Sequence, residues 1–175
     1  NFEAFVRSSG QNIDWRSRGV FPPIQDQGLC GSCYSFATTA TVEAAFKIKY
    51  NQLTKMSEQQ IVDCTRSMGN NGCDNGIVSV TFDYLKKYSL STAKSYPYVG
   101  KVGSCKVSPD TSKSLLSSYV NLKAYDENAL KAAVAKTPLV VAVDASLPSF
   151  QHYKSGIYSD TRCSSSQVNH AVTCA

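Results

Sequence analysis

Two residue types in this sequence could form a nucleophile and its base. Cys33 follows the turn-rich segment 27–32 and precedes an apolar run, so we expect it at the N-terminus of a helix. A helix N-terminus favours negative charge by about 0.3–1 kcal/mol, which promotes the reactive thiolate form of a cysteine. A thiol nucleophile also needs a base, usually a histidine, and the sequence has two: His152 in a polar and aromatic segment, and His170 in an apolar one. These residues could support covalent catalysis.

The loop before Cys33 also offers a way to stabilise an oxyanion. Acyl transfer places negative charge on a carbonyl oxygen, and hydrogen-bond donors aimed at that oxygen lower the barrier. The side-chain amide of Gln27 is one candidate donor, because it lies six residues before Cys33 in a glycine-containing loop. The backbone N–H of Cys33 is the second.

The same residues have other interpretations. Cys30 and Cys33 match the redox pattern C-x-x-C, in which Cys33 would be a redox thiol and His170 incidental. Cys33 could instead be a disulfide partner, and a lone histidine in an apolar strand is more often structural than catalytic. A zinc site is disfavoured, because the sequence has no second C-x-x-C pair and only two histidines. The residues alone therefore leave three interpretations open: covalent catalysis by Cys33, a redox pair of Cys30 and Cys33, and a structural role for Cys33 and His170.

Helices are expected to position Cys33. Residues 34–45 contain one charged residue, Glu43, and their apolar residues recur at helical spacing, which predicts a buried helix of about four turns through residue 48. Ser57 begins a capping box for a short helix ending at Cys64. A third helix is expected over 77–88. A fourth is expected over 127–136, capped by Asp126, stopped by Pro138 and facing inward through Leu130, Ala133 and Val134.

Strands are expected to position His170. Residues 139–143 form a continuous run rich in β-branched residues, typical of a strand buried on both faces. Further strands are expected at 156–158 and 168–172. Helices before residue 137 and strands after it predict an α+β fold with a helical lobe first and a sheet or barrel second. Because the sequence ends within an expected strand, we expect the second lobe to be incomplete in these residues.

Composition excludes several classes of protein. With 175 residues and 42% hydrophobic residues, the chain can bury a core as one domain or two small lobes, and it is not disordered. The net charge of +5 comes from scattered basic residues, which argues against nucleic-acid binding, and no apolar stretch predicts a membrane span. Residues 1–10 do not resemble a signal peptide. Seven cysteines indicate disulfides and an oxidising compartment, and the odd number leaves at least one unpaired within the chain.

The segment 25–37, Gln-Asp-Gln-Gly-Leu-Cys-Gly-Ser-Cys-Tyr-Ser-Phe-Ala, resembles the active-site signature of papain-like cysteine peptidases. Within that family the similarity is to the cathepsin L-like endopeptidase branch. Other matches follow in the family's order and extend the resemblance over about residues 12–175: segments 13–16, 57–64, 72–76, 96–98 with Cys105, 156–158 and 169–172.

The resemblance implies a fold and a reaction. It implies a papain-like two-lobe fold across residues 1–175, with a helical lobe at about 12–110 and the first part of a β-barrel lobe at about 111–175, flanking an active-site cleft. It also implies a cysteine endopeptidase that forms a thioester acyl-enzyme on Cys33, with His170 as acid and base and Gln27 as oxyanion donor. The alternatives are a catalytically silent homologue that binds or supports other molecules and, more remotely, a thiol–disulfide oxidoreductase using Cys30 and Cys33.

The resemblance also assigns substrate contacts and disulfides. It implies an apolar S2 pocket and an extended-substrate edge built from Gly31, Asn75, Gly76, Ile77, Val78, Ala142, Val168, Asn169 and Ala171. It pairs Cys30 with Cys73 and Cys64 with Cys105. It leaves Cys163 with a partner beyond residue 175 and Cys174 as a buried thiol, although a Cys163–Cys174 bridge is an alternative.

The sequence departs from the family pattern at three points. Tyr34 stands where the family usually has tryptophan, and Asn75 stands where it usually has glycine. The asparagine that orients the histidine in the family has no counterpart up to residue 175, and Asn169 occupies a different position, just before the histidine.

The resemblance further implies no cofactor and no metal. The expected partners are peptide or protein substrates, the protein's own pro-segment and cystatin-type inhibitors, without nucleic acid or membrane. We expect a monomeric zymogen, secreted or in a lysosomal or vacuolar compartment.

Overall fold

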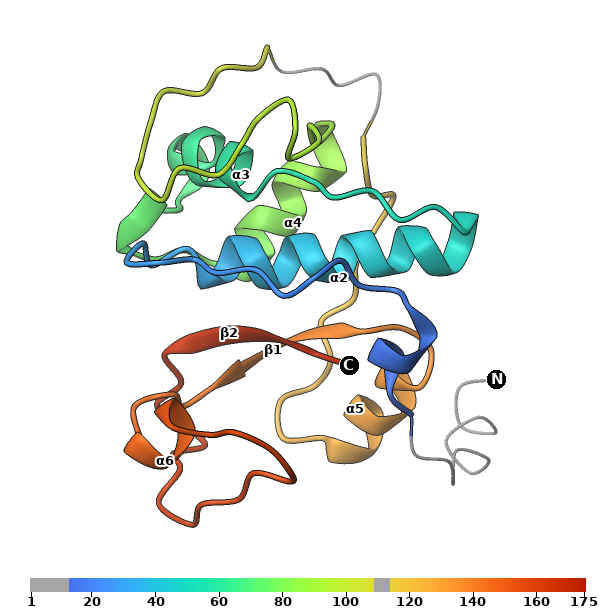
Figure 1. Cartoon of the computed structure of the whole chain (residues 1–175), viewed down its shortest axis with the longest axis vertical. Coiled ribbons are helices and arrows are strands. Elements are labelled where there is room, and N and C mark those ends of the chain that lie inside the picture. Colours follow the sequence, from blue (N-terminus) through green and yellow to red (C-terminus); the bar gives the residue numbers. More distant parts are fainter. Residues whose placement is uncertain (1–12, 109–113) are drawn as a thin grey trace.

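Helix α2, Cys33–Tyr50, runs through the middle of the molecule (Figure 1). The computed structural model describes residues 13–108 and 114–175. Residues 1–10, for which no signal peptide was expected, lie outside this range, and so does the expected lobe boundary near residue 110. The 18 residues of α2 make about five turns, one more than predicted. The extension is polar: the Asn51 N–H caps the helix on the Lys47 carbonyl, and the Lys47 ammonium donates to the Asn51 side chain at 2.8 Å.

Two shorter helices pack on one side of α2. Helix α3, Glu58–Cys64, begins where Ser57 accepts a hydrogen bond from the Gln60 N–H at 3.0 Å, as the capping box predicts. Helix α4, Val78–Lys87, carries Tyr84 and Leu85, which join Val42 of α2 in one buried cluster. The short 3₁₀ turns η2, Arg66–Met68, and η3, Gly72–Asp74, connect α3 to α4. These helices therefore form a layer that packs on α2, above it in Figure 1.

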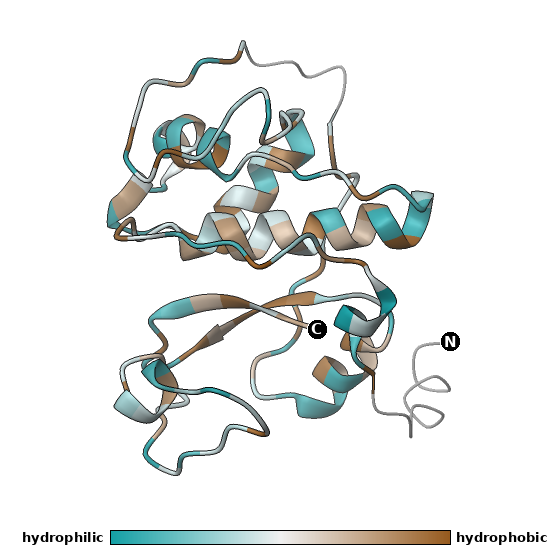
Figure 2. Cartoon of the chain, in the orientation of Figure 1, coloured by the Kyte–Doolittle hydropathy of each residue, from teal (hydrophilic) through white to brown (hydrophobic). Residues whose placement is uncertain are grey.

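Two strands lie on the other side of α2 (Figure 1). Strand β1, Leu139–Val143, pairs antiparallel with β2, His170–Cys174, in the register from Leu139 with Cys174 to Val143 with His170. The Thr173 hydroxyl donates to the Ala37 carbonyl at 3.3 Å, which ties β2 to α2. In Figure 2 the hydrophobic colour follows both strands where they pass along α2. Apolar strand residues therefore supply the contact surface.

The predicted burial of 139–143 on both faces is wrong. The strand is partly buried, and Ala142 is exposed. Within residues 13–108 and 114–175 the sheet has two strands, so β1 has one paired edge and α2 beside it. A continuous apolar run therefore does not by itself show what covers its second face.

Two other strand predictions also need correction. Residues 156–158 form no strand, and the Ile157 side chain is exposed; Tyr158 instead contacts Phe150 edge to face across the loop that follows the one-turn helix α6, Pro148–Gln151. Strand β2 begins at His170 rather than at residue 168. Strand formation depends on a partner, and residues 156–158 have none among the described residues.

Helix α5, Glu127–Val134, is capped by Asp126 as predicted, and it ends two residues before the predicted end at 136. Its fully buried residue is Ala132, whereas the predicted inward residues Leu130, Ala133 and Val134 are only partly buried. The helix end meets the N-terminal segment, where the Trp15 indole of η1, Trp15–Arg18, donates to the Val134 carbonyl. Residues 13–20 thus pack with the second half of the chain.

Candidate active site

Cys33 is the first residue of α2, which confirms the predicted helix N-terminus. Its thiol is partly buried and forms no disulfide. Ser32 precedes it as the N-cap residue, and the Ser32 carbonyl accepts from the N–H of Ser35 at 2.8 Å, closing the first turn. Cys33 therefore stands at the end of α2 where the helix dipole is positive.

The loop before α2 is held against the η3 segment. Cys30 forms a disulfide with Cys73, and the Gly31 N–H donates to the Cys73 carbonyl at 2.8 Å. A Cβ on Gly31 would lie 2.6 Å from the Cys73 oxygen, so only glycine allows this approach.

Gln27 is anchored through its side chain. Its Nε2 donates to the Cys30 carbonyl at 2.9 Å. An amide nitrogen carries two hydrogens, so the second can donate to an oxyanion while the first fixes the side chain to the loop.

His170 is the first residue of β2, which packs against α2. In Figure 1 both elements begin at the same end of the molecule, so Cys33 and His170 are each the first residue of their element at that end. Burial lowers the pKa of the half-buried His170 imidazole below its usual value. The preceding Asn169 donates its N–H to the Val143 carbonyl at 3.0 Å and accepts from the Ala145 N–H at 2.9 Å, which fixes the backbone next to His170.

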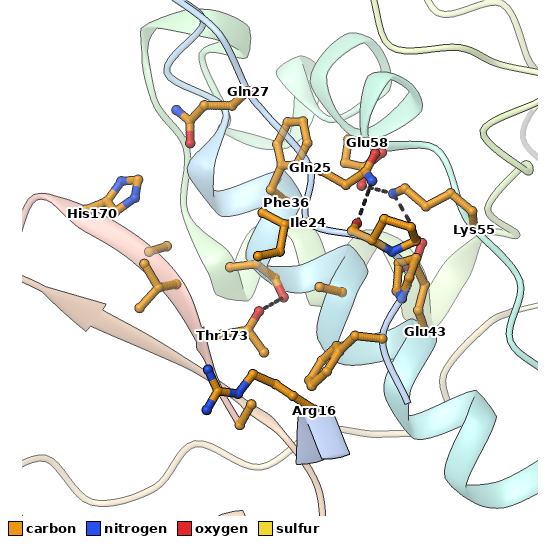
Figure 3. A pocket seen from close by; sticks show the side chains of 18 residues that line it. Arg16, Ile24, Gln25, Gln27, Phe36, Glu43, Lys55, Glu58, His170 and Thr173 are labelled. Atoms are coloured by element: carbon orange, nitrogen blue, oxygen red, sulfur yellow. Dashed lines mark hydrogen bonds and ion pairs between the residues drawn. The ribbon is translucent and has the colours of Figure 1, made fainter. Parts of the chain in front are cut away.

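A pocket of about 400 Å³ lies between segment 21–27, α2 and β2 (Figure 3). Gln27 and His170 line one end of it, and Glu43, Lys55 and Glu58 line the other. Cys33 is not among the lining residues, although Phe36, Ala37 and Ala40 of the same helix are. The structure therefore places two of the three predicted catalytic side chains in one pocket and the third at the start of an adjoining helix.

The polar end of the pocket was not predicted from the sequence. The Glu43 side chain is buried, and its Oε1 accepts from the Met56 N–H at 2.6 Å and from Lys55, which also pairs with Glu58. Its Oε2 has no hydrogen-bond partner among the described residues, and burial raises the pKa of Glu43 to about 7. The available signal was that Glu43 is the single charged residue in segment 34–45.

With this geometry in place, comparison with known proteins decides the family. Residues 9–175 match the family described as "Papain family cysteine protease". The chain belongs to this family.

Relatives and a solved structure agree with this membership. The chain is 44% identical over 173 residues to "Cysteine proteinase 6" of Dictyostelium discoideum, covering 97% of this chain and 40% of that protein. It is 37% identical to "Procathepsin L" of Mus musculus, covering 93% and 49%. The chain therefore spans less than half the length of these curated relatives.

The solved structure of the Carica candamarcensis cysteine protease CMS1MS2 in complex with E-64 matches with a TM-score of 0.84 and 33% identity, covering 92% of this chain and 74% of that chain. The predicted papain-like α+β fold is confirmed by this similarity.

The papain-family disulfides occur in this structure. Cys30 pairs with Cys73 and Cys64 with Cys105, as the resemblance implies. Cys30 is therefore not available as the partner of Cys33 that a redox C-x-x-C motif requires. Cys163 is exposed and Cys174 is partly buried, and neither forms a disulfide here, so the alternative bridge between them is absent. Burial raises the pKa of the Cys174 thiol, which makes it less reactive than an exposed thiol.

The two papain-family departures near the substrate edge have visible consequences. The Tyr34 ring is buried, its hydroxyl donates to the Gly72 carbonyl at 2.9 Å, and a Cβ on Gly76 would lie 2.7 Å from the ring. Tyr34 therefore fills the tryptophan position and needs glycine at residue 76. Asn75 is exposed with φ of 103°, in the region that favours glycine, so the asparagine is strained where the family has glycine.

The expected S2 residues come from three places. Ala142 and Ala171 lie opposite each other in the register of β1 and β2. Val168 lies just before β2, and Ile77 and Val78 lie at the start of α4. Ile77 and Val168 have exposed side chains, which leaves them accessible to a ligand.

No cluster of three or more His, Cys, Asp or Glu that could hold a metal ion occurs in residues 13–108 and 114–175. Within the same residues, no helix has the length and hydropathy needed to cross a membrane.

Proposed function

We propose that the protein is a cysteine endopeptidase with Cys33 as nucleophile. The Cys33 thiolate attacks the scissile carbonyl carbon, and the resulting oxyanion accepts hydrogen bonds from Gln27 Nε2 and the Cys33 N–H. The His170 imidazolium protonates the leaving amine, which departs and leaves a thioester on Cys33. Neutral His170 then takes a proton from the water that attacks the thioester, and collapse of the intermediate releases the acid and restores the Cys33 thiolate and the His170 imidazolium.

One observation carries this proposal. Cys33 is an unbridged thiol at the first position of α2, and His170 is the first residue of the strand that packs on that helix. The loop that carries Gln27 ends at the same point, tied there by the Cys30–Cys73 disulfide. The proposed nucleophile, base and oxyanion donor therefore come from three elements near the same end of α2.

We assign substrate binding to nine residues around this end. Gly31, Asn75 and Gly76 form the edge for an extended substrate, and Asn169 adjoins the base. The S2 pocket consists of Ile77, Val78, Ala142, Val168 and Ala171. Endopeptidase action is supported by the segment 72–105, which contains no histidine pair that could clamp a terminal carboxylate.

Substitution of the nucleophile tests the function. In the full-length protein, Cys33→Ser should abolish hydrolysis of a long peptide capped at both ends, because an alcohol cannot form the ion pair that the thiol forms with His170. The matched control Cys174→Ser removes another unbridged thiol and should retain activity. The parent should release internal fragments by mass spectrometry. Cys33→Ser activity within tenfold of the parent would contradict the nucleophile, and products limited to terminal dipeptides would contradict the cleavage mode.

A catalytically silent homologue would give a different result with a peptidyl epoxide. The proposed enzyme should be labelled on Cys33, whereas a silent homologue would remain unlabelled. The name "Procathepsin L" of one relative supports a zymogen with its own pro-segment. On the same basis we propose lysosomal or secreted localisation, peptide or protein substrates, cystatin-type inhibitors and a monomer.

A further inference from the structure

Tyr98 connects the two parts of the backbone that carry the proposed oxyanion donors. Its hydroxyl donates to the Gln27 carbonyl at 2.8 Å, across 71 residues of sequence. Its oxygen also lies 2.8 Å from the Ser32 hydroxyl. Because a carbonyl can only accept, the Tyr98 hydrogen points to Gln27, and the Ser32 hydroxyl can then donate to Tyr98, which is closer to it than its other acceptor, the Cys30 carbonyl at 3.4 Å. A continuous hydrogen-bond chain therefore runs from Ser32 through Tyr98 to Gln27.

Each end of this chain adjoins a proposed donor. Gln27 contributes its side-chain amide, and Ser32 is the residue whose peptide bond carries the Cys33 N–H. The separation of these two donors determines whether both reach one oxyanion, because such donors must lie about 2.7–3.1 Å from its position. A hydrogen-bond chain that joins Gln27 to Ser32 through Tyr98 therefore bears on a distance on which the reaction depends.

The hydrogen bonds of the Ser32 side chain indicate that its contact with Tyr98 does more than stabilise helix α2. Ser32 occupies the N-cap of α2, but its side chain makes no cap hydrogen bond, whereas Ser57 at the N-cap of α3 bonds the Gln60 N–H. An N-cap serine normally bonds a free N–H of its own helix. Here the Ser32 hydroxyl contacts Tyr98 instead, so the side chain links the start of α2 to Tyr98 rather than capping the helix.

Tyr98 is itself held firmly. Its ring meets the ring of Phe36 edge to face, with centroids 4.9 Å apart. The next residue, Val99, donates its N–H to the side chain of buried Gln59 on α3 at 2.9 Å. The hydroxyl is therefore fixed by contacts from α2 and α3 that do not involve the loop of Gln27.

We infer that Tyr98 is a positioning residue that fixes Gln27 relative to the start of α2 and so keeps both oxyanion donors at their working separation. This inference rests on the proposed peptidase function. It concerns a residue that touches no reacting atom and acts through Gln27.

The test is Tyr98→Phe in the full-length protein, which removes the hydroxyl and keeps the ring contact with Phe36. Loss of an entire oxyanion donor typically lowers kcat by about 10²–10³, so a displaced donor should lower kcat by roughly tenfold. KM should stay within about twofold, because the side chain does not line the substrate edge. The matched control Tyr84→Phe removes another hydroxyl, bonded to Gln60 on the far side of α3, and should leave kcat unchanged.

A double variant shows whether Tyr98 acts through Gln27. In a Gln27→Ala background, Tyr98→Phe should lower kcat by less than about twofold, because the donor that it positions is already absent. Unchanged kcat in Tyr98→Phe, an equal loss in Tyr84→Phe, or a full tenfold further loss in the Gln27→Ala background would each overturn the inference. Failure of the proposed function looks different: the parent itself would lack thiol-dependent hydrolysis.

Discussion

The partial burial of His170 disfavours the positive charge that its imidazole must carry in the proposed mechanism. Burial lowers the pKa of its imidazole, so the neutral form is favoured when no counter-charge is present. The proposed mechanism needs the imidazolium to protonate the leaving amine. The Cys33 thiolate must therefore supply the stabilisation that burial removes, and each group of the pair depends on the other for its charge.

This dependence predicts the titration of His170. In a Cys33→Ser variant the pKa of His170 should fall below the usual value of about 6.5, because burial acts without a thiolate. In the parent the pKa of His170 should lie above that of the variant, because a thiolate next to the imidazole favours its charged form. NMR titration measures both pKa values, with the His170 signal assigned by its loss in a His170→Gln variant. Identical titration in the two proteins would show that no ion pair forms.

Residue types and spacing predicted the position of Cys33 at a helix N-terminus but not the contacts that surround the site. Cys33 was assigned from a loop followed by a helical pattern, which are both local signals. The partners of Glu43 and Tyr98 were not assigned, because the Glu43–Lys55 and Tyr98–Gln27 contacts join different elements and exist only after packing. A sequence without an alignment carries no direct record of such contacts.

At the scale of elements, the junction of α2 and α3 contains a buried acid that should make stability depend on pH. Burial is the largest cause that raises the pKa of Glu43 to about 7, from 4.5 without burial. Between these values the folded state keeps a proton that the unfolded state releases. Unfolding therefore becomes more favourable as pH rises, and the loss between pH 4.5 and 7 is on the order of 2–3 kcal/mol.

Glu43→Gln tests this dependence. The amide keeps an oxygen for the Met56 N–H but does not ionise, so the contribution of this site to the pH dependence should vanish. The free energy of unfolding from urea titrations at pH 4.5 and 7 should fall less with rising pH in the variant than in the parent. Glu127→Gln, on the exposed first turn of α5, is the matched control and should keep the parental slope. A parental slope in Glu43→Gln would show that Glu43 is ionised throughout this range.

Elements whose sequence signals are local were predicted more accurately than those that depend on distant partners. The helices α2, α3, α4 and α5 were found because spacing, caps and Pro138 act within one segment. The end of α2 was missed because a polar Lys47–Asn51 cap extends it. The expected strand at 156–158 was wrong because pairing needs a distant partner, and the aromatic contact of Tyr158 holds that segment instead.

At the scale of the whole molecule, α2 joins two layers of different kinds. The helices α3 and α4 pack on one side of it and the strands on the other (Figure 1). The proposed nucleophile lies on α2 and the proposed base on β2, so this pair can form only when both layers are in place. The proposed S2 pocket also requires both layers, because its residues come from the start of α4 and from the strand segment that includes β1 and β2.

The composition of that pocket predicts which substrates the molecule prefers. The five side chains assigned to S2 are aliphatic, and none carries a charge that could pair with a cationic P2 residue. Burying a leucine or phenylalanine side chain contributes about 1.5–3 kcal/mol, whereas an unpaired buried arginine is unfavourable. Ala142 and Ala171, opposite each other in the sheet, leave room for a bulky group.

We therefore expect the full-length protein to prefer P2 leucine, phenylalanine or valine over arginine by at least about tenfold in kcat/KM, a ratio within the reach of one pocket. Matched Phe-Arg and Arg-Arg dipeptidyl substrates, which differ only at P2, measure it. Ala171→Glu supplies the missing charge and should narrow the ratio by raising kcat/KM for Arg-Arg. Equal kcat/KM for the two substrates in the parent would mean that these aliphatic residues do not form the pocket, or that an acidic residue outside residues 1–175 completes it.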